Sequence, residues 1–334
     1  MEYRSLGRSG VKVSALCVGT MNFGRVTEED EAIRIVHAAL DAGINFIDTA
    51  DWYSAGRSEE MIGKALEGGR RNRVVLATKF TTPMGKGPNE GGSSRLWMMR
   101  ACEDSLRRLC TDRIDLYQVH WMDLTTPLEE TLRALDDLCR QGKVVYVGCS
   151  KFAPSYIAEA MMLCRQYGWV RFISEQPPYN LLDRRIENEL VWTCQRFGLG
   201  IIPWAPLGGG ILSGKYSRES QPPQGSRYSS IGGNRLHEKA LEIAEVVVAL
   251  AKEKGVEPAV LATAWVMNQP GITAPILGPR TVEHLVSSLK ALDVQITDEE
   301  RKRLDEVAPP GTAVSDFYDV NVYRRLREAV GLKG

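Results

Sequence analysis

The chain has 334 residues, and its 42 lysines and arginines balance its 42 aspartates and glutamates. This balance gives no electrostatic basis for binding nucleic acid or an anionic membrane surface. The longest uncharged apolar stretch, residues 199–212, contains two prolines and is shorter than the roughly 20 residues that span a bilayer. We therefore expect a soluble protein with neither partner.

The cysteine pattern indicates whether the protein lies in a reducing or an oxidising compartment of the cell. The seven cysteines are scattered through the chain without a Cys-x-x-Cys pair. An odd, unpatterned set in a long chain indicates reduced thiols, most of them small buried apolar residues. Residues 1–20 also lack the apolar core of a secretory signal. We therefore expect a cytoplasmic protein.

Short β-branched or apolar runs alternate with amphipathic stretches along the chain. Two short runs around Gly7 and Gly10 predict a β-hairpin ahead of this repeat. Eight further runs predict strands at 15–19, 45–50, 74–80, 114–120, 144–150, 171–176, 200–205 and 273–278. Helical patterns predict helices at 28–43, 58–69, 93–110, 126–142, 183–198, 238–254 and 281–292, with additional ones at 297–307 and 321–330.

This order of elements favours a (β/α)8 TIM barrel, an α/β fold. An open doubly wound sheet gives a similar order but usually carries Gly-x-Gly-x-x-Gly after its first strand, and that spacing is absent from the sequence. We expect one barrel domain over residues 1–334, with the hairpin capping its bottom and extra C-terminal helices. The long segment at about 207–237 is expected to be functional or mobile.

A glycine-rich segment follows the seventh predicted strand. Residues 207–216, LGGGILSGKY, contain Gly-x-x-x-x-Gly-Lys, most of a P-loop. Tyr216 stands where a P-loop needs a Ser or Thr to ligate Mg²⁺, which disfavours a triphosphatase. The alternative is that the glycines let backbone N–H groups approach a different phosphate, with Lys215 supplying charge.

Six consecutive predicted strands end in polar or large aromatic residues: Asp48, Lys79, His120, Ser150, Gln176 and Trp204. Active sites of barrels lie at the carboxyl ends of the strands, so we expect these side chains to share one pocket. Asp48 and Lys79 can pair. Tyr53 follows Asp48 by five residues, and a nearby Lys79 would lower its pKa from about 10, which suits a general acid.

The same residues argue against a metal. His120 comes with no second histidine or carboxylate pair, which disfavours a metal-dependent isomerase. An acid and a hydrogen-bond donor that face one oxygen suit carbonyl reduction. No side chain supplies hydride, so this hypothesis requires a nicotinamide cofactor.

Over nearly its whole length the chain resembles an aldo-keto reductase. The resemblance rests on the entry hairpin and on GTMNFG (19–24), GINFIDTADWYS (43–54), ATKF (77–80), RIDLYQVHW (113–121), GKVVYVGCSKF (142–152), EQPPYNLL (175–182), PWAPLGGGILSGKY (203–216) and PILGPRTVEHL (275–285). It implies a catalytic tetrad of Asp48, Tyr53, Lys79 and His120, with Tyr53 as the proton donor. The implied reaction is reduction of an aldehyde or ketone by NADPH.

The resemblance also implies that NADPH, or NADH, lies across the barrel top. Ser150 and Gln176 would hold the nicotinamide carboxamide, and Trp204 would stack on the ring. Arg280 would contact a 2′-phosphate. The implied cofactor contacts are Gly19, Thr20, Met21, Asp48, Tyr53, Ser150, Gln176, Trp204, Ala205, Pro206, Leu207, Gly208, Gly210, Leu212, Gly214, Lys215, Gly278, Arg280, His284 and Ser288.

The sequence departs from the family's pattern at three positions. Lys151 stands where Asn is frequent, and His284 and Ser288 replace frequent Gln or Arg and Asn, so the choice between NADPH and NADH stays open. The candidate substrate pocket for a small carbonyl compound comprises Phe23, Trp52, His120 and Trp121. The alternative function is an NADPH-binding redox sensor or scaffold that resembles potassium-channel β subunits. The sequence predicts no oligomeric state.

Overall fold

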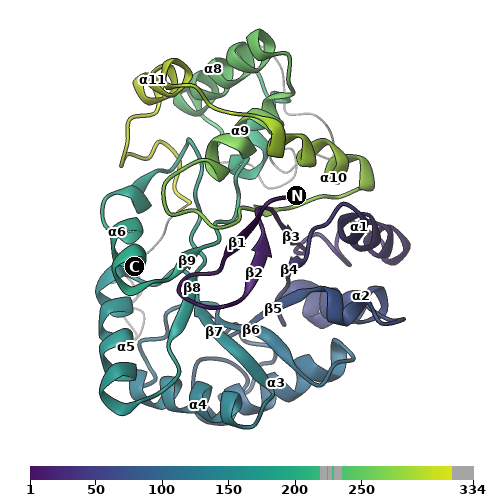
Figure 1. The fold of residues 1–334 in the computed structure, drawn as a ribbon, viewed down its shortest axis with the longest axis vertical. Coiled ribbons are helices and arrows are strands. Elements are labelled where there is room, and N and C mark those ends of the chain that lie inside the picture. Colours follow the sequence, from purple (N-terminus) through teal and green to yellow (C-terminus); the bar gives the residue numbers. More distant parts are fainter. Residues whose placement is uncertain (219–223, 225–227, 229–234, 318–334) are drawn as a thin grey trace.

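The fold is taken from a computed structural model, which describes residues 1–218, 224, 228 and 235–317 (Figure 1). The helix expected at 321–330 lies outside the described residues, as do residues 219–223, 225–227 and 229–234 of the long segment expected at about 207–237. Among the described parts of the chain, no helix is long and apolar enough to cross a bilayer. All seven cysteines are free thiols.

Eight parallel strands form one curled sheet, which confirms the predicted α/β barrel. In sheet order the strands are β10 (Ile276–Leu277), β3 (Cys17–Gly19), β4 (Phe46–Asp48), β5 (Val75–Phe80), β6 (Ile114–Val119), β7 (Val144–Cys149), β8 (Phe172–Glu175) and β9 (Gly200–Ile201). The edge strands approach each other, because the Thr273 N–H donates to Ile201 O at 2.8 Å and the Ile276 N–H donates to Pro203 O at 2.8 Å. The carboxyl ends of all eight strands therefore face the same end of the molecule.

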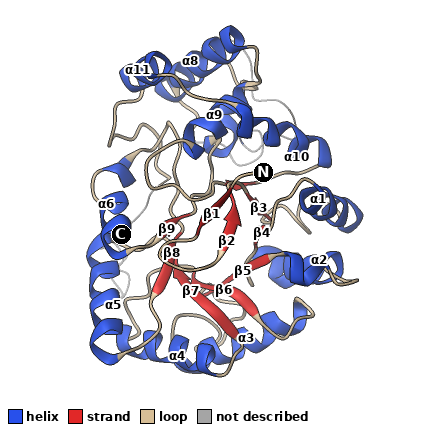
Figure 2. Ribbon diagram, in the orientation of Figure 1, coloured by secondary structure: helices blue, strands red, loops and turns tan. Residues whose placement is uncertain are grey.

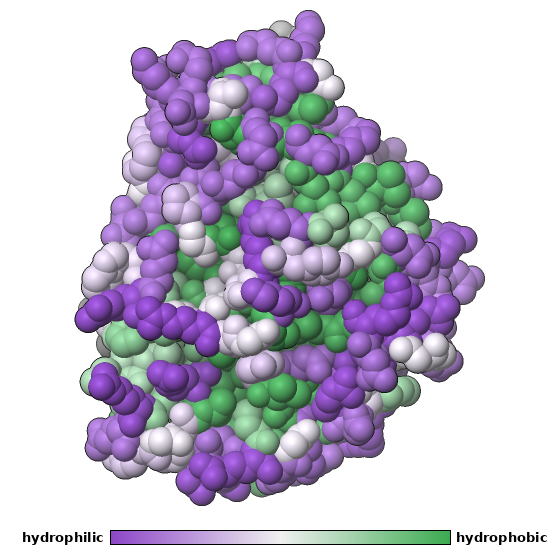
Figure 3. Space-filling view, in the orientation of Figure 1, coloured by the Kyte–Doolittle hydropathy of each residue, from purple (hydrophilic) through white to green (hydrophobic). Residues whose placement is uncertain are grey.

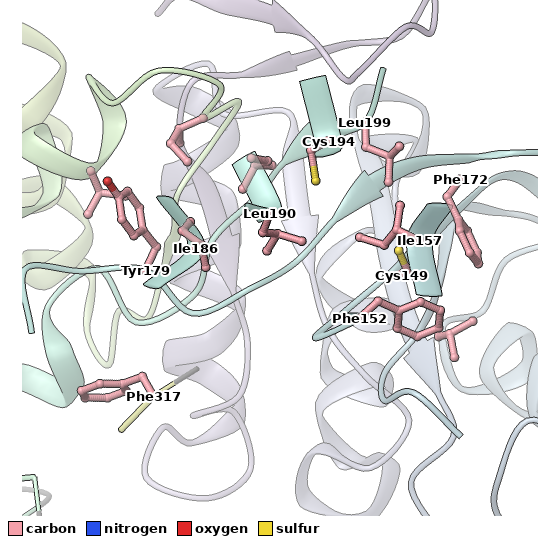
Figure 4. Packing of buried hydrophobic residues seen from close by; sticks show 14 of the residues in the cluster. Cys149, Phe152, Ile157, Phe172, Tyr179, Ile186, Leu190, Cys194, Leu199 and Phe317 are labelled. Atoms are coloured by element: carbon pink, nitrogen blue, oxygen red, sulfur yellow. The ribbon is translucent and has the colours of Figure 1, made fainter. Parts of the chain in front are cut away.

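Helices surround this sheet (Figure 2). They are α1 (Glu29–Asp41), α2 (Arg57–Ala65), α3 (Arg95–Arg108), α4 (Leu128–Arg140), α5 (Pro154–Tyr167), α6 (Leu190–Phe197), α8 (Glu238–Lys254), α9 (Pro258–Met267), α10 (Val282–Leu289) and α11 (Asp298–Val307). Short 3₁₀ helices cover Tyr53–Gly56, Arg70–Arg73, Arg185–Glu187, Gly208–Ser213 and Lys290–Asp293. Buried side chains such as Ile157 and Leu190 fill the space between the outer helices and the sheet (Figure 4).

Three helix predictions need correction. The sequence analysis missed α5 and α9, and the helix expected at 183–198 is split into a 3₁₀ turn and α6. Every residue of α9 from Val260 to Met267 is buried. A helix enclosed on all sides has no polar face, so it lacks the periodicity that identifies a surface helix. The split before α6 is held by buried Asp183, whose carboxylate accepts hydrogen bonds from the Arg185 side chain at 2.7 Å and from the Phe317 N–H at 2.8 Å.

The N-terminal hairpin closes the end of the barrel at which the strands begin. β1 (Tyr3–Ser5) and β2 (Lys12–Ser14) pair antiparallel and lie across the strands in Figure 1. Leu6 and Val13 are fully buried in the apolar cluster inside the barrel. The turn sits close to the strands: a Cβ on Gly7 would lie 2.4 Å from Ile173 O. Charged and polar residues cover much of this face, with smaller apolar groups between them (Figure 3).

Candidate active site

A buried lysine lies at the centre of the candidate site. Lys79 of β5 is fully buried, and its Nζ donates to Asp48 Oδ2 at 2.5 Å, Thr49 O at 2.8 Å and Tyr53 Oη at 3.1 Å. These contacts use all three donors of an ammonium group. A buried cation needs such partners, because removing an unpaired ammonium from water costs roughly several kcal/mol.

Two amides hold the other oxygen of Asp48. Asp48 Oδ1 accepts from Gln118 Nε2 at 3.0 Å and from Gln176 Nε2 at 2.8 Å. Gln176 also donates to Gln118 Oε1 at 3.2 Å. The sequence analysis missed Gln118, although its position two residues before His120 in an otherwise apolar strand offered a signal, since alternate residues of a strand share a face. The ends of four strands, β4, β5, β6 and β8, thus supply one network.

Tyr53 is presented by a turn with unusual backbone angles. Ser54, Ala55 and Gly56 have φ values of 51°, 54° and 92°, a left-handed conformation that costs energy for residues with a side chain. Ser54 Oγ anchors this turn by donating to Phe23 O at 2.8 Å. The Tyr53 ring meets His120 edge-on, with centroids 6.0 Å apart. The turn therefore brings the phenol against both Lys79 and His120.

Burial corrects the expectation for the Tyr53 pKa. Burial raises the pKa of Tyr53, and the Lys79 ammonium only partly offsets this effect. Burial lowers the pKa of Lys79, but Asp48 and Tyr53 outweigh it, so the net direction is upward. The pKa of His120 falls well below its usual range because of burial, with Lys151 and Lys79 adding to the effect. At neutral pH the site thus holds a neutral phenol, an ammonium and a neutral imidazole.

The aromatic candidates of the substrate pocket differ in accessibility. Trp52 and Trp121 are 52% and 36% exposed, whereas Phe23 is fully buried in the apolar cluster that packs on α1 and α2. Trp121 stacks on His120 with centroids 5.5 Å apart, and its Nε1 donates to Thr82 Oγ1 at 3.1 Å. Trp52 and Trp121 can therefore offer surface to a ligand in this arrangement, whereas His120 and Phe23 are buried.

Ser150, Gln176 and Trp204 follow three successive strands. Ser150 Oγ donates to Gln176 O at 2.8 Å. Trp204 is half-buried, and its indole N–H, itself buried, has no hydrogen-bond partner among the described residues. The next residue, Ala205, has φ 56°, and its carbonyl accepts from Asn180 Nδ2 at 3.0 Å. Because this unpartnered N–H belongs to the aromatic ring itself, the Trp204 side chain fits a planar polar ligand.

The glycine segment is packed more tightly than its composition indicates. Gly208, Gly209 and Gly210 have φ values of 55°, 69° and 99°. A Cβ on Gly209 would lie 2.7 Å from the Tyr228 hydroxyl, and one on Gly210 would lie 2.8 Å from Lys215 Nζ. The left-handed backbone at these three positions therefore favours glycine, whatever the space around it. The Lys215 ammonium lies directly against this turn, an arrangement suited to an anion.

The remaining candidates of this segment surround the turn. A Cβ on Gly208 would lie 2.7 Å from a Leu182 methyl group. Pro206 and Leu212 are buried, and Leu207 is half-buried. Tyr216, in the position that a P-loop gives to a magnesium ligand, is buried and packs edge-on against Tyr228 with centroids 5.6 Å apart. Its role is packing, so the segment is not a P-loop.

The start of α9 connects the glycine segment to α10. A Cβ on Gly214 would lie 3.1 Å from Pro258 Cγ. The neighbouring Glu257 accepts from Ser287 Oγ at 2.6 Å and from Lys290 Nζ at 2.9 Å. Candidate contacts separated by about 70 residues in the chain are thus brought to one edge of the barrel.

The segment before α10 is tied to the loop after β3. Gly278 O accepts from Asn22 Nδ2 at 3.0 Å, and Arg280 O accepts from Thr27 Oγ1 at 3.1 Å. The other candidates along this edge differ in exposure: Gly19 and Thr20 are buried, Met21 and His284 are exposed, and Ser288 is half-buried. Ser288 Oγ donates to His284 O at 2.8 Å. Solvent therefore reaches the side chains of Met21, His284 and Ser288, and also that of Arg280, which is half-buried.

The fold and site together define the class of protein. It is an α/β barrel with a buried tyrosine–lysine–aspartate network at the carboxyl ends of its strands. Across the parts of the chain that the structure describes, no three His, Cys, Asp or Glu side chains could hold a metal ion.

Comparison with known proteins assigns the family. The chain belongs to the aldo/keto reductase family, whose model matches residues 15–309. It is 40% identical over 330 residues to an uncharacterized oxidoreductase of Bacillus subtilis, covering 95% of this chain and 99% of that protein. It is 35% identical to a versiconal hemiacetal acetate reductase of Aspergillus parasiticus, covering 93% and 98%. It is also 37% identical to a probable voltage-gated potassium channel subunit beta of Oryza sativa subsp. japonica, covering 88% and 92%. The chain is therefore an oxidoreductase of a family that uses nicotinamide cofactors.

Proposed function

We propose that this chain reduces aldehydes or ketones to alcohols with NADPH as the reductant and Tyr53 as the proton donor. The observation that carries this proposal is the 3.1 Å contact between Tyr53 Oη and the Lys79 ammonium, itself paired with Asp48. The nicotinamide, when bound, supplies the hydride that reaches the carbonyl carbon. The Tyr53 O–H then gives its proton to the carbonyl oxygen, so the products are the alcohol and a transient tyrosinate.

Each tetrad residue has a part in this step. Lys79 stabilises the tyrosinate by its positive charge. A proton from solvent then restores the neutral phenol of Tyr53. Asp48 holds the lysine in place. His120, kept neutral by burial, donates a hydrogen bond from a ring nitrogen to the carbonyl oxygen and orients it.

Several features support a nicotinamide dinucleotide, and one of them, Arg280, favours NADPH over NADH. Lys215 against the glycine turn suits a pyrophosphate, and the guanidinium of Arg280 suits a 2′-phosphate. The indole of Trp204 and the side chains of Ser150 and Gln176 would hold the nicotinamide. The remaining cofactor contacts expected from the sequence belong to the same proposal.

A second candidate is supported by the potassium channel β-subunit relative. In this alternative the chain binds NADPH and acts as a redox sensor or scaffold. It would bind the cofactor tightly and turn over aldehydes slowly or not at all.

The test combines cofactor titration with turnover. Nicotinamide fluorescence should show binding of NADPH more tightly than NADH, and a panel of aldehydes should then be reduced. In Tyr53→Phe, NADPH affinity should stay within about threefold while kcat falls by about 10²–10⁴, the usual contribution of a general acid. Turnover unchanged in the variant would contradict the acid assignment, and binding without turnover in the wild type would favour the sensor.

A further inference from the structure

The hydroxyl group of Thr82 lies between two ring nitrogens of the candidate site. Thr82 is half-buried and follows the end of β5 by two residues. Its Oγ1 accepts a hydrogen bond from Trp121 Nε1 at 3.1 Å and lies within hydrogen-bond distance of His120 Nδ1, at 3.4 Å. One hydroxyl thus contacts both the histidine proposed to orient the carbonyl and the indole that stacks on this histidine.

The donors and acceptors of these three groups favour one direction for the contact with His120. An indole N–H can only donate, so Trp121 occupies one of the two acceptor positions of the hydroxyl. The hydroxyl has a single proton to donate, and Nδ1 is the one acceptor within hydrogen-bond distance of it among the residues that the structure describes. Donation from Thr82 to His120 Nδ1 therefore gives this proton a partner in the protein, whereas donation from an Nδ1–H would leave it without one.

His120 can accept at Nδ1 because its imidazole is neutral. The side chain is buried, and burial lowers its pKa well below the usual range, with Lys151 and Lys79 adding to the effect. A neutral imidazole carries one N–H, so a ring that accepts at Nδ1 holds its proton on Nε2. The Nε2–H is then the donor that can reach the carbonyl oxygen of a substrate.

The backbone beside Thr82 is held in an uncommon conformation. Thr81 has φ 111°, which a β-branched residue adopts at a cost and keeps only where its surroundings fix it. Its Oγ1 accepts from the His120 N–H at 3.3 Å, and its carbonyl accepts from the Gly92 N–H at 2.8 Å. The His120 N–H also donates to Phe80 O at 3.0 Å. These bonds tie the end of β5 to the end of β6, so the hydroxyl and the imidazole face each other from fixed points.

We propose that Thr82 is a positioning residue that holds His120 in its Nε2–H tautomer, with Nε2 aimed at the carbonyl oxygen of the substrate. This inference rests on the carbonyl reductase function proposed above. With the proton on Nδ1 instead, Nε2 would present a lone pair to an oxygen that is itself an acceptor. Thr82 acts through the imidazole alone, and the proton and hydride transfers are those already described.

NMR measures the tautomer directly. The full chain is labelled with ¹⁵N-histidine, and a two-dimensional spectrum correlates the ring carbon protons with the ring nitrogens. The chain has four histidines, and the signals of His120 are those that disappear in His120→Gln. In the wild type Nε2 should carry the proton and Nδ1 should not. Thr82→Ser keeps the hydroxyl and should give the same pattern, whereas Thr82→Val keeps the shape without the hydroxyl and should give a mixture of both tautomers.

Reduction of 4-methylbenzaldehyde with NADPH measures the consequence for the reaction. In Thr82→Val, kcat/KM should fall about tenfold, because the histidine donor no longer keeps its aim. Thr82→Ser should retain activity within about threefold, and NADPH affinity should stay within about threefold in both variants. The matched control is Thr111→Val at the end where the strands begin. The half-buried Thr111 hydroxyl accepts from Arg71 Nε at 2.9 Å, and its loss should leave kcat/KM unchanged.

The outcomes separate this inference from the proposed function. A wild-type His120 with its proton on Nδ1, or a Thr82→Val spectrum identical to that of the wild type, overturns this inference alone. Unchanged kcat/KM in Thr82→Val also overturns it, because the imidazole would then be oriented without the hydroxyl. No turnover of any aldehyde by the wild type overturns the proposed function, and the spectra still show whether Thr82 sets the tautomer of His120.

Discussion

At the scale of single residues, burial decides the charge states at the site. A lysine next to a tyrosine predicts a lowered tyrosine pKa, yet the pKa of Tyr53 is raised because desolvation of the phenolate is the larger effect. The neutral phenol that results is the form that donates a proton. In the proposed reaction, Lys79 would act mainly on the tyrosinate, because the low dielectric of the buried site would otherwise disfavour its negative charge.

Glu175 gives a prediction about stability at this scale. Burial raises its pKa from 4.5 to about 7. The folded state therefore keeps this proton where the unfolded chain has lost it, so this group makes the free energy of unfolding fall as the pH rises from about 4.5 to about 7. The fall should amount to about 3 kcal/mol. Glu175→Gln keeps the acceptor for the Phe152 N–H and removes this dependence.

Urea denaturation of both proteins at pH 5 and pH 8 checks this prediction. The difference in the free energy of unfolding between Glu175→Gln and wild type should favour the variant more at pH 8 than at pH 5, by about 2.5 kcal/mol. Equal pH dependence of the two proteins would show that Glu175 does not hold its proton in the folded state.

At the scale of an element, the turn after β4 fixes the position of Tyr53, the residue proposed as the proton donor. Gly56 has φ 92°, and a Cβ there would lie 2.8 Å from Arg108 Cδ. Arg108 cannot move freely, since its Nε donates to buried Glu59 at 2.7 Å, and Glu59 in turn accepts from Thr78, the residue before Lys79, at 2.5 Å. The turn that presents Tyr53 thus packs against an ion pair between half-buried Arg108 and buried Glu59.

Gly56→Ala should therefore destabilise the protein by about 2–4 kcal/mol, through backbone strain and displacement of Arg108. It should also lower kcat, because Tyr53 lies three residues before the substituted position. The matched control is Gly255→Ala at the end of α8, where φ is 71° but nothing lies within 4 Å of the new Cβ.

That control should cost only about 1 kcal/mol and leave kcat unchanged. Thermal unfolding and steady-state kinetics on both variants provide the measurement. Equal losses of stability in Gly56→Ala and Gly255→Ala would mean that the Arg108 side chain moves aside without an energetic penalty.

At the scale of the whole molecule, stability and chemistry lie at opposite ends of the barrel. The hairpin closes the end at which strands begin, with Leu6 inside the barrel, and the tetrad occupies the end at which they finish. This separation is common in barrels. It lets the closed end be rigid while the open end carries strained turns and long loops.

Leu6→Ala should lower the free energy of unfolding by about 2–5 kcal/mol, because it leaves a cavity in a packed core. The folded enzyme should keep its kcat. Leu96→Ala on α3 removes a side chain that is 58% exposed and should change stability by less than about 0.5 kcal/mol. Chemical denaturation and kinetics test both variants, and a large loss of kcat in Leu6→Ala at temperatures where it is folded would contradict the separation.

The sequence determined much of this protein by itself. The alternating strand and helix patterns, together with the absence of the Gly-x-Gly-x-x-Gly spacing, predicted the barrel. The positions of Asp48, Lys79 and His120 at predicted strand ends predicted that they lie close together, because parallel strands in a closed sheet finish at one end. The helix at 238–254 coincides with α8, since its apolar face and terminal Gly255 are local properties.

Only the tertiary structure decided the rest. Helix α9 is enclosed by other elements, so its sequence lacks the alternation of apolar and polar residues that identifies a surface helix. The direction of the Tyr53 pKa depends on how deeply the phenol is buried, and the contact of Thr82 with Trp121 joins residues that follow two different strands. Gln118 joins the network because β4, β6 and β8 converge on one carboxylate. These properties come from distances between segments far apart in the chain, and a linear pattern contains no such distances.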